Sequence, residues 1–77
     1  MTNTTRTNAL QPWQQRVVDE KADLDKRANA LSHFIGLAPQ FLRLDPAEQE
    51  RMKVQNDLMW QLSEVLGERI ANFKDES

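Results

Sequence analysis

The chain has 77 residues, of which ten are basic and twelve acidic, and its formal net charge is −2. This length allows one small domain. The charge balance argues against a nucleic-acid partner, because duplex-binding proteins usually present a clearly basic face. The chain has no cysteine and a single histidine, His33, so we expect no disulfide and no metal site.

The apolar residues and the N-terminal region give the expected location of the protein. No apolar run approaches the roughly 20 residues of a membrane-spanning helix. Residues 1–8 lack the apolar segment of a secretory signal. We therefore expect a cytoplasmic protein that does not bind membranes. Residues 1–9 are rich in threonine and asparagine and show no period, which predicts a disordered tail.

The first predicted helix covers residues 12–35. Its apolar residues are separated by three, four or seven positions, which places them on one helix face: Trp13, Val17, Leu24, Ala28, Leu31 and Ile35. The opposite face is charged and carries Asp19, Glu20, Asp23, Lys26 and Arg27. Pro12 suits a first helical turn, and Gly36 is the residue type that often follows the end of a helix.

The connector, residues 37–44, is too apolar to be a solvated loop. We predict a short helical turn after Pro39, because proline is well tolerated at the start of a helix. Phe41, Leu42 and Leu44 are then expected to fold over one end of the two long helices.

The second predicted helix covers residues 46–73. Asp45 can cap its free N–H groups, Pro46 occupies the first helical position, and Glu48 would complete a capping box. Its apolar residues are numerous: Met52, Leu58, Met59, Leu62, Val65, Leu66, Ile70 and Phe73. Gly67 interrupts the helix at a cost of about 1 kcal/mol relative to alanine. It marks either a close approach of the two helices or a tolerated surface glycine.

Two long helices joined by a short connector form an antiparallel hairpin. The predicted fold is therefore all-α, with one domain over residues 10–74 and a frayed tail at residues 75–77. The apolar positions of the second helix span a wider arc than one partner helix can cover. We therefore expect a homo-oligomer, either a dimer or a tetramer, in which hairpins form a multi-helix bundle.

The sequence offers no arrangement of residues for catalysis. Ser32 and His33 are adjacent, so their side chains point about 100° apart on a helix and are poorly placed to work together. Asp19, Glu20, Asp23 and Asp25 form a dense run that is typical of a solvated face. No glycine-rich phosphate loop, paired-histidine helix or calcium loop is present. We expect a protein that is not an enzyme and holds no cofactor.

Aromatic and basic residues mark one end of the predicted hairpin. Trp13, Gln15 and Arg16 lie at the start of the first helix, and Arg69 and Phe73 lie near the end of the second. An antiparallel hairpin brings these segments together. Aromatic faces beside guanidinium groups suit a nucleotide-like ligand, which is held by base stacking and by bidentate bonds to phosphate.

A plainer reading of the same residues is that Trp13 and Phe73 close the end of the bundle. In that reading, Arg16 and Arg69 form ordinary ion pairs with Glu20 or Glu68. Trp60 stands one position after Met59. Its place in the pattern favours a contact between protomers over a platform for a ligand.

Much of the ordered chain resembles a widespread group of very small proteins from crAss-like and other tailed phages and prophages. The resemblance covers residues 11 to about 73. Its distinctive parts are the start at Gln15, Arg16 and Val17 and the end at Leu66, Arg69 and Ile70. The chain departs from the family pattern at Trp60, where tyrosine is usual, and in its long apolar connector.

The resemblance implies a function and a set of site residues. Small phage proteins of this kind include oligomeric sponges that sequester nucleotide signals of bacterial defence systems: cyclic oligonucleotides in CBASS and ADP-ribose derivatives in Thoeris. A similar protein would act in the host cytoplasm without turnover and hold its ligand between protomers. Arg16 and Arg69 would bind phosphates, and Trp13 or Trp60 would stack on a base.

Two alternatives stay open at this point. The first is an adaptor or host-takeover factor that grips a host helix with the apolar face of the second helix. The second is a helical DNA-binding accessory protein, which the charge balance disfavours.

Overall fold

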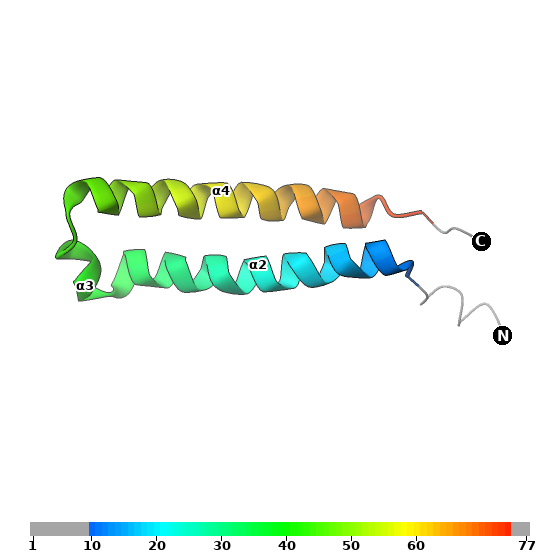
Figure 1. The fold of residues 1–77 in the computed structure, drawn as a ribbon, viewed down its shortest axis with the longest axis horizontal. Helices are drawn as coiled ribbons and strands as arrows, with labels where there is room; N and C mark the ends of the chain where they lie inside the picture. The colour runs from blue at the N-terminus through cyan, green and yellow to red at the C-terminus, as the bar shows by residue number, and fades with distance from the viewer. Residues whose placement is uncertain (1–9, 75–77) are drawn as a thin grey trace.

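The structure, a computed structural model, describes residues 10–74. Its three helices are α2 (Pro12–Leu37), α3 (Pro39–Leu42) and α4 (Pro46–Ala71). The two long helices lie side by side and antiparallel, with α3 at the turn between them (Figure 1). This confirms the all-α hairpin with a short helical connector. The tails predicted at residues 1–9 and 75–77 lie outside the described residues.

Helix α2 begins at Pro12 as predicted but ends two residues later than predicted, at Leu37. Gly36 lies inside the helix and has no positive φ, so the prediction that it terminates the helix is wrong. The helix ends because Ala38 is extended, with φ −81° and ψ 124°. The residue before a proline is disfavoured in the helical conformation, and Pro39 therefore sets the boundary.

The connector is a single helical turn, and it closes one end of the hairpin mainly through Phe41. The Phe41 side chain is buried and meets the ring of Phe34 edge-on, with centroids 6.2 Å apart. Leu44 is half-buried, as predicted, whereas Leu42 is 76% exposed. Adjacent residues of a helix point about 100° apart, so the inward turn of Phe41 directs Leu42 to solvent.

Helix α4 has the predicted start. The carboxylate of Asp45 accepts a hydrogen bond from the Ala47 N–H at 3.1 Å, which caps one of the free amide groups. The expected capping box does not form, because the Glu48 side chain bonds to Arg51 at 2.9 Å instead. The helix ends at Ala71, two residues before the predicted end.

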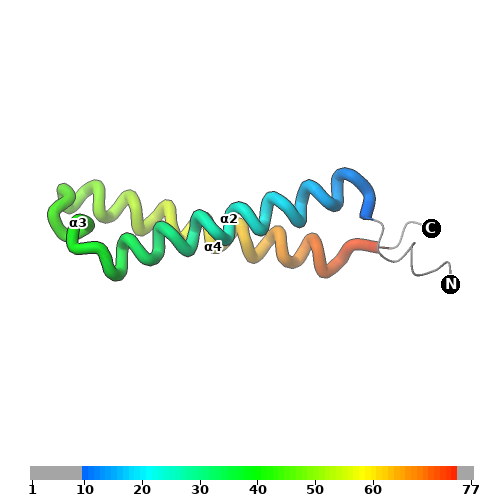
Figure 2. Tube along the Cα trace, turned by 90° about the horizontal axis from the view of Figure 1, so that it is seen from below, coloured from blue at the N-terminus to red at the C-terminus, as the bar shows by residue number. Residues whose placement is uncertain are grey.

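The hairpin core is small and lies between the two long helices, which cross near their middle (Figure 2). Its buried apolar residues are Val17, Leu24, Ala28, Phe41 and Leu66. Met59, Ile70 and Phe73 pack against the part of this core built by Val17, Leu24 and Leu66. None of the described side chains of this core is both large and fully buried. A hairpin of this size therefore removes little apolar surface from water.

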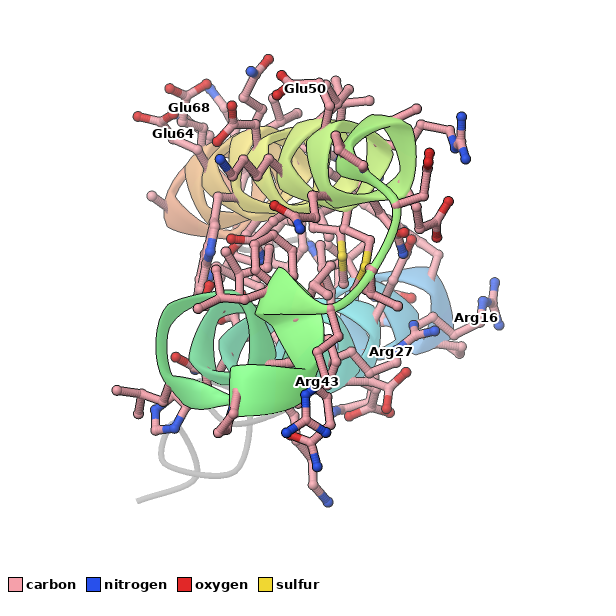
Figure 3. All side chains as sticks on the ribbon, turned by 90° about the vertical axis from the view of Figure 1, so that its left-hand side faces the viewer. Arg16, Arg27, Arg43, Glu50, Glu64 and Glu68 are labelled. Carbon is pink, nitrogen blue, oxygen red and sulfur yellow. The ribbon has the colours of Figure 1, made fainter. Side chains whose placement is uncertain are left out.

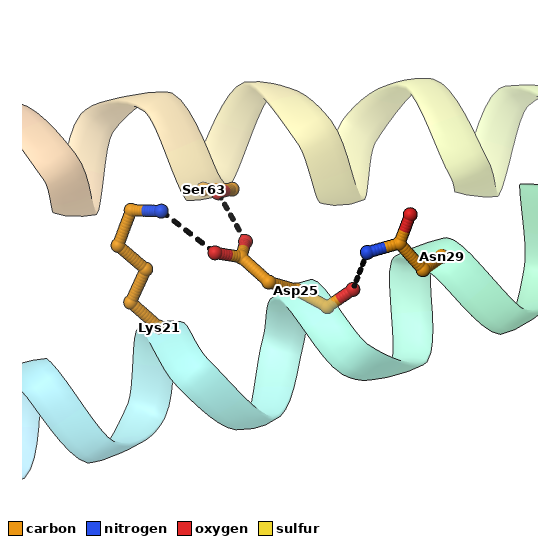
Figure 4. A network of polar contacts seen from close by, with 4 residues as sticks. All are labelled: Lys21, Asp25, Asn29 and Ser63. Carbon is orange, nitrogen blue, oxygen red and sulfur yellow. Dashed lines mark hydrogen bonds and ion pairs between the residues drawn. The ribbon is translucent and has the colours of Figure 1, made fainter.

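Polar residues also occupy the interface between α2 and α4, which the sequence analysis did not anticipate. The Asp25 carboxylate accepts a hydrogen bond from Lys21 at 2.7 Å and a second one from the Ser63 hydroxyl on α4 (Figure 4). Asn29 donates to the Asp25 carbonyl at 3.0 Å. Asp25 is thus half-buried and hydrogen-bonded to the facing helix. The prediction that it lies on a solvated face is wrong.

A second polar cluster lies nearer the connector. Asn56 of α4 donates to the Ala28 carbonyl at 3.0 Å and accepts from the Ser32 hydroxyl at 2.8 Å. The Trp60 indole N–H in turn donates to the Ser32 oxygen at 3.1 Å. We call Lys21, Asp25, Ser32, Asn56 and Ser63 the polar seam. Within residues 10–74, no buried side-chain nitrogen or oxygen lacks a hydrogen-bond partner, so the seam carries no desolvation penalty of that kind.

Gly67 lies against a side chain of α2 and not against its backbone, so it is neither of the two readings left open by the sequence. A Cβ atom at this position would lie 3.2 Å from the Cε atom of Lys21. The lysine side chain passes over the glycine on its way to Asp25, and the missing side chain makes room for it.

None of the helices of residues 10–74 has the length and hydropathy needed to cross a membrane.

Candidate ligand site at the open end of the hairpin

The open end of the hairpin is the end where α2 begins and α4 finishes. The antiparallel arrangement brings Trp13 and Phe73 into contact there, with ring centroids 5.3 Å apart and planes at 78°. This edge-to-face geometry is a favourable one for aromatic pairs. Phe73 is half-buried, whereas Trp13 is 45% exposed. The pair therefore closes the end of the core and also leaves part of an indole ring accessible.

The two arginines that were predicted to bind a ligand lie at this same end. Arg16 follows Trp13 by three residues and Arg69 precedes Phe73 by four, so each lies about one helical turn from an aromatic ring. Both side chains are exposed, and Arg16 extends from one side of α2 (Figure 3). The open end thus combines an accessible indole with two guanidinium groups.

The plainer reading of these arginines predicted ion pairs with Glu20 or Glu68. Among residues 10–74 the ion pairs are Lys21–Asp25, Asp23–Arg27 and Glu48–Arg51. Neither Arg16 nor Arg69 takes part in any of them. The predicted pairs with Glu20 and Glu68 are therefore absent from the described part of the chain.

Two of the six predicted site residues do not join the others. The side-chain amide of Gln15 donates to Asp19 at 3.0 Å on the exposed side of α2. Trp60 precedes Phe73 by 13 residues, which is about 20 Å along a helix, and its indole N–H is engaged by Ser32. Within one chain, Trp60 is therefore too far from the open end to contact a ligand bound there.

The sequence analysis did not anticipate the burial of Gln14, which stands between Trp13 and Gln15 and is the most buried polar residue near the open end. Its side chain is 3% exposed and its oxygen accepts the backbone N–H of Gln11 at 2.8 Å. This bond satisfies one of the free amide groups before α2. A signal for it was present, because Gln14 precedes the core residue Val17 by three positions and therefore shares its helix face.

The chemistry available at the open end is binding chemistry. An exposed aromatic ring can stack on a base, and forked guanidinium donors match phosphate oxygens. The start of α2 adds the positive end of a helix dipole within one turn of Arg16. Among the described residues, no group of three or more His, Asp or Glu side chains is arranged to hold a metal ion.

A separate hollow lies on the outer face of α2. It is shallow and open, and it is lined by Lys26, Asn29, Ala30 and His33. It is more than ten residues from Trp13 along the same helix, or at least 15 Å at about 1.5 Å per residue. It is therefore not part of the open end.

Comparison with known proteins identifies the family. The family model described as Sequestin matches residues 11–72, which include all three helices and every predicted site residue except Phe73. Neither the curated proteins nor the solved structures give a match. The family match is consistent with the resemblance to small phage anti-defence proteins, which covers the same part of the sequence. The chain belongs to the Sequestin family.

Proposed function

We propose that this protein is a non-enzymatic sponge of phage origin that sequesters a nucleotide-derived immune signal of a bacterial defence system. The observation that carries the proposal is the family match over residues 11–72, because the name Sequestin points to sequestration. The resemblance to phage sponges supplies the ligand class, which is a cyclic oligonucleotide or an ADP-ribose derivative. The protein would act in the cytoplasm of the infected cell.

The open end supports this proposal with suitable binding groups. Trp13 offers an indole face for a base or nicotinamide-like ring, and Arg16 and Arg69 offer donors for phosphates. Capture by stoichiometric binding needs no general acid, base or nucleophile. Trp60 would act in a different place, either at a second contact or between protomers.

The small core supports an oligomeric sponge. Five apolar residues are buried in the hairpin, while several large apolar side chains of α4 remain exposed. Small domains usually need a further source of stability, and association with other copies is a common one. A dimer or a tetramer of hairpins would provide it.

Calorimetric titration of the full chain with cyclic dinucleotides, larger cyclic oligonucleotides and ADP-ribose derivatives tests the function. We expect one of these to bind more tightly than about 100 µM. Arg16→Ala and Arg69→Ala should each weaken that binding by about 1.5–3 kcal/mol, because each removes a charge-assisted hydrogen bond. Arg27→Ala is the matched control, since Arg27 is exposed on α2 (Figure 3). It follows Arg16 by eleven residues, which is about three helical turns farther from the open end.

Three results would contradict the proposal. The first is the absence of binding below about 100 µM across the panel. The second is unchanged affinity in both open-end variants, which would move the site elsewhere. The third is chemical conversion: a sponge returns its ligand intact after heat release, so a changed mass of the recovered ligand would indicate an enzyme.

The alternative function is a helical adaptor that binds a host protein through the apolar face of α4. It is favoured by one observation, the exposure of Val54, Leu58, Leu62 and Val65 in the single hairpin. An adaptor would bind no nucleotide in the titration. Its affinity for a host partner would fall when these side chains are replaced by charged ones.

A further inference from the structure

The binding groups of the open end share one face of the hairpin. The opposite face is marked by Asp25 of α2 and Trp60 of α4, each of which bonds across to the other helix. Arg16 precedes Asp25 by nine residues and Arg69 follows Trp60 by nine, which is half a revolution around each helix. Trp13 is only about 60° from Arg16 around α2. The indole and both guanidinium groups are therefore presented on the same side.

Gln14 stands between two of these groups in the sequence but turns inward. Its side chain is 3% exposed, and its oxygen accepts the backbone N–H of Gln11 at 2.8 Å. The two glutamines form a capping box. The Gln15 N–H bonds to the Gln11 carbonyl at 3.0 Å and closes the same turn. Gln14 thus holds, from inside the hairpin, the turn that carries Trp13 and Arg16.

The first turn of α2 depends on this contact more than the first turn of α4 depends on its own. The N-cap residue of α2 is Gln11, whereas helices are usually capped by Ser, Thr, Asp or Asn. Helix α4 has such a residue in Asp45. A first turn without a cap frays. Fraying here would end the one-turn spacing that places Trp13 beside Arg16.

The cap at Gln14 is also uncharged. A capping box accepts either glutamate or glutamine at this position, and the helix dipole favours acidic residues in a first turn. Helix α4 has Glu48 in its first turn, whereas α2 has no acidic residue in its own. A carboxylate at position 14 would lie within one turn of Arg16 and repel a phosphate bound there. Glutamine supplies the acceptor and leaves the positive charge of the open end available.

We propose that Gln14 is the positioning residue of the candidate ligand site. It fixes the turn that carries Trp13 and Arg16 before a ligand arrives, and its acceptor adds no negative charge beside the bound anion. A prepared site binds more tightly, because binding does not have to order a loose turn. The role of the neutral charge rests on the proposed function, whereas the fixed turn is a property of the free protein.

Two variants separate the acceptor of Gln14 from its neutral charge. Gln14→Met keeps a side chain of similar length and removes the acceptor, whereas Gln14→Glu keeps an acceptor and adds a charge. The same two changes at Gln61 are the matched controls. Gln61 is exposed on α4 and precedes Phe73 by twelve residues, or about 18 Å along a helix. Circular dichroism checks that every variant keeps the helix content of the wild type.

Amide exchange in the free protein, measured by NMR at residues 15–17, tests the fixed turn. We expect Gln14→Met to accelerate exchange there about fivefold, which is the effect of losing a typical helix cap. Gln14→Glu and both Gln61 variants should exchange at the wild-type rate. Exchange at the wild-type rate in Gln14→Met would overturn the proposal.

Gln11→Pro tests the same bond without a change in the core, and it decides the question if Gln14→Met does not fold. Gln11 has φ −63°, which suits proline, and the change removes the N–H that Gln14 accepts. We expect the same acceleration of exchange at residues 15–17. A wild-type rate in Gln11→Pro would show that the turn holds without this bond and would contradict the proposal.

Calorimetric titration with ADP-ribose and with cyclic di-AMP, at about pH 8, tests the effect on binding. The backbone N–H of Gln11 and the alkaline pH keep the carboxyl of Gln14→Glu ionised. For a probe that binds the wild type, Gln14→Met should raise Kd about threefold to tenfold. Gln14→Glu should raise it at least about tenfold at low salt and less at high salt.

The Gln14→Glu protein distinguishes positioning for an anion from a purely structural cap. A structural cap predicts wild-type affinity in this variant, because the acceptor is kept. Wild-type affinity, or a Kd no higher than that of Gln61→Glu, would therefore contradict the proposal. If neither probe binds the wild type, the proposed function fails for these ligands, and the amide exchange still decides whether Gln14 fixes the turn.

Discussion

Asp25 connects the two long helices through its side chain. Lys21 donates to one carboxylate oxygen and Ser63 of the facing helix donates to the other. The hydrogen bond from Lys21 is the largest cause that holds the pKa of the Asp25 carboxyl below its ordinary value of 3.8, and the bond from Ser63 is the next. The charge of Lys21 acts in the same direction, and partial burial opposes it. The charged form of Asp25 therefore favours the folded state.

The lowered pKa of Asp25 gives a pH dependence with a definite sign. A carboxyl whose pKa is lower in the folded state stabilises the fold above its unfolded pKa, and this contribution is lost as pH falls through the lower folded pKa. We expect the unfolding midpoint of the wild type to fall below about pH 4. Asp25→Asn should lower the midpoint at neutral pH and reduce that acid dependence, as measured by urea unfolding followed by circular dichroism.

The control for this measurement is Asp57→Asn, which changes an exposed carboxylate of α4. It should leave the midpoint at neutral pH unchanged. If Asp25→Asn behaves like the control at neutral pH and keeps the full acid dependence, the Asp25 contacts do not stabilise the hairpin.

The face of α2 that packs against α4 shows why the sequence analysis was incomplete at the scale of single residues. Gln14, Val17, Lys21, Leu24 and Ala28 are separated by three and four positions in alternation, as are the residues at the core of a coiled coil. Only the apolar members were read as core, because polar side chains are mostly exposed. A polar side chain can be buried where it finds a hydrogen-bond partner on the facing helix. The sequence of one helix does not show which residues of the other helix will lie opposite it.

The long helices are held in register by the second polar cluster as well as by apolar packing. Asn56 bonds to two groups of α2 at once, the Ala28 carbonyl and the Ser32 hydroxyl. A polar residue at a core position can fix the alignment of two helices, because any other alignment leaves it without partners. This function belongs to the pair of helices and is not visible in either one.

Asn56→Ala tests the contribution of this cluster. The change removes the Asn56 bonds to the Ala28 carbonyl and to the Ser32 O–H, while Ser32 still accepts from Trp60. We expect a loss of about 1–2 kcal/mol in the free energy of unfolding. Gln61→Ala is a suitable control, because Gln61 is exposed on α4. Chemical unfolding of both variants provides the measurement. A loss in the Asn56 variant no larger than in the control would mean that solvent replaces these bonds at no cost.

Helix boundaries were predictable where the local chemistry is strong. Asp45 followed by Pro46 defines the start of α4, and the cap is formed as predicted. The end of α2 was misplaced because glycine permits a helix end but does not require one, whereas Pro39 disfavours the helical conformation of the residue before it. The hairpin itself followed from two long amphipathic segments and a short connector.

At the scale of the molecule, the sequence predicted which residues meet but not all members of the site. An antiparallel hairpin places the start of one helix beside the end of the other, so the contact of Trp13 with Phe73 follows from topology alone. Trp60 was assigned to the same set by resemblance, and its separation from Phe73 by half of α4 shows that one chain cannot bring them together. Its relation to a ligand depends on the arrangement of protomers.

The most direct test of the sponge account is native mass spectrometry of the full chain, purified from cells in which the bacterial defence system is active. We predict an assembly with an even number of copies that retains a small molecule of nucleotide mass, and that releases it unchanged on denaturation. The Arg16→Ala and Arg69→Ala proteins should form the same assembly with less of that molecule. A wild-type protein that is monomeric and free of any nucleotide would contradict the account.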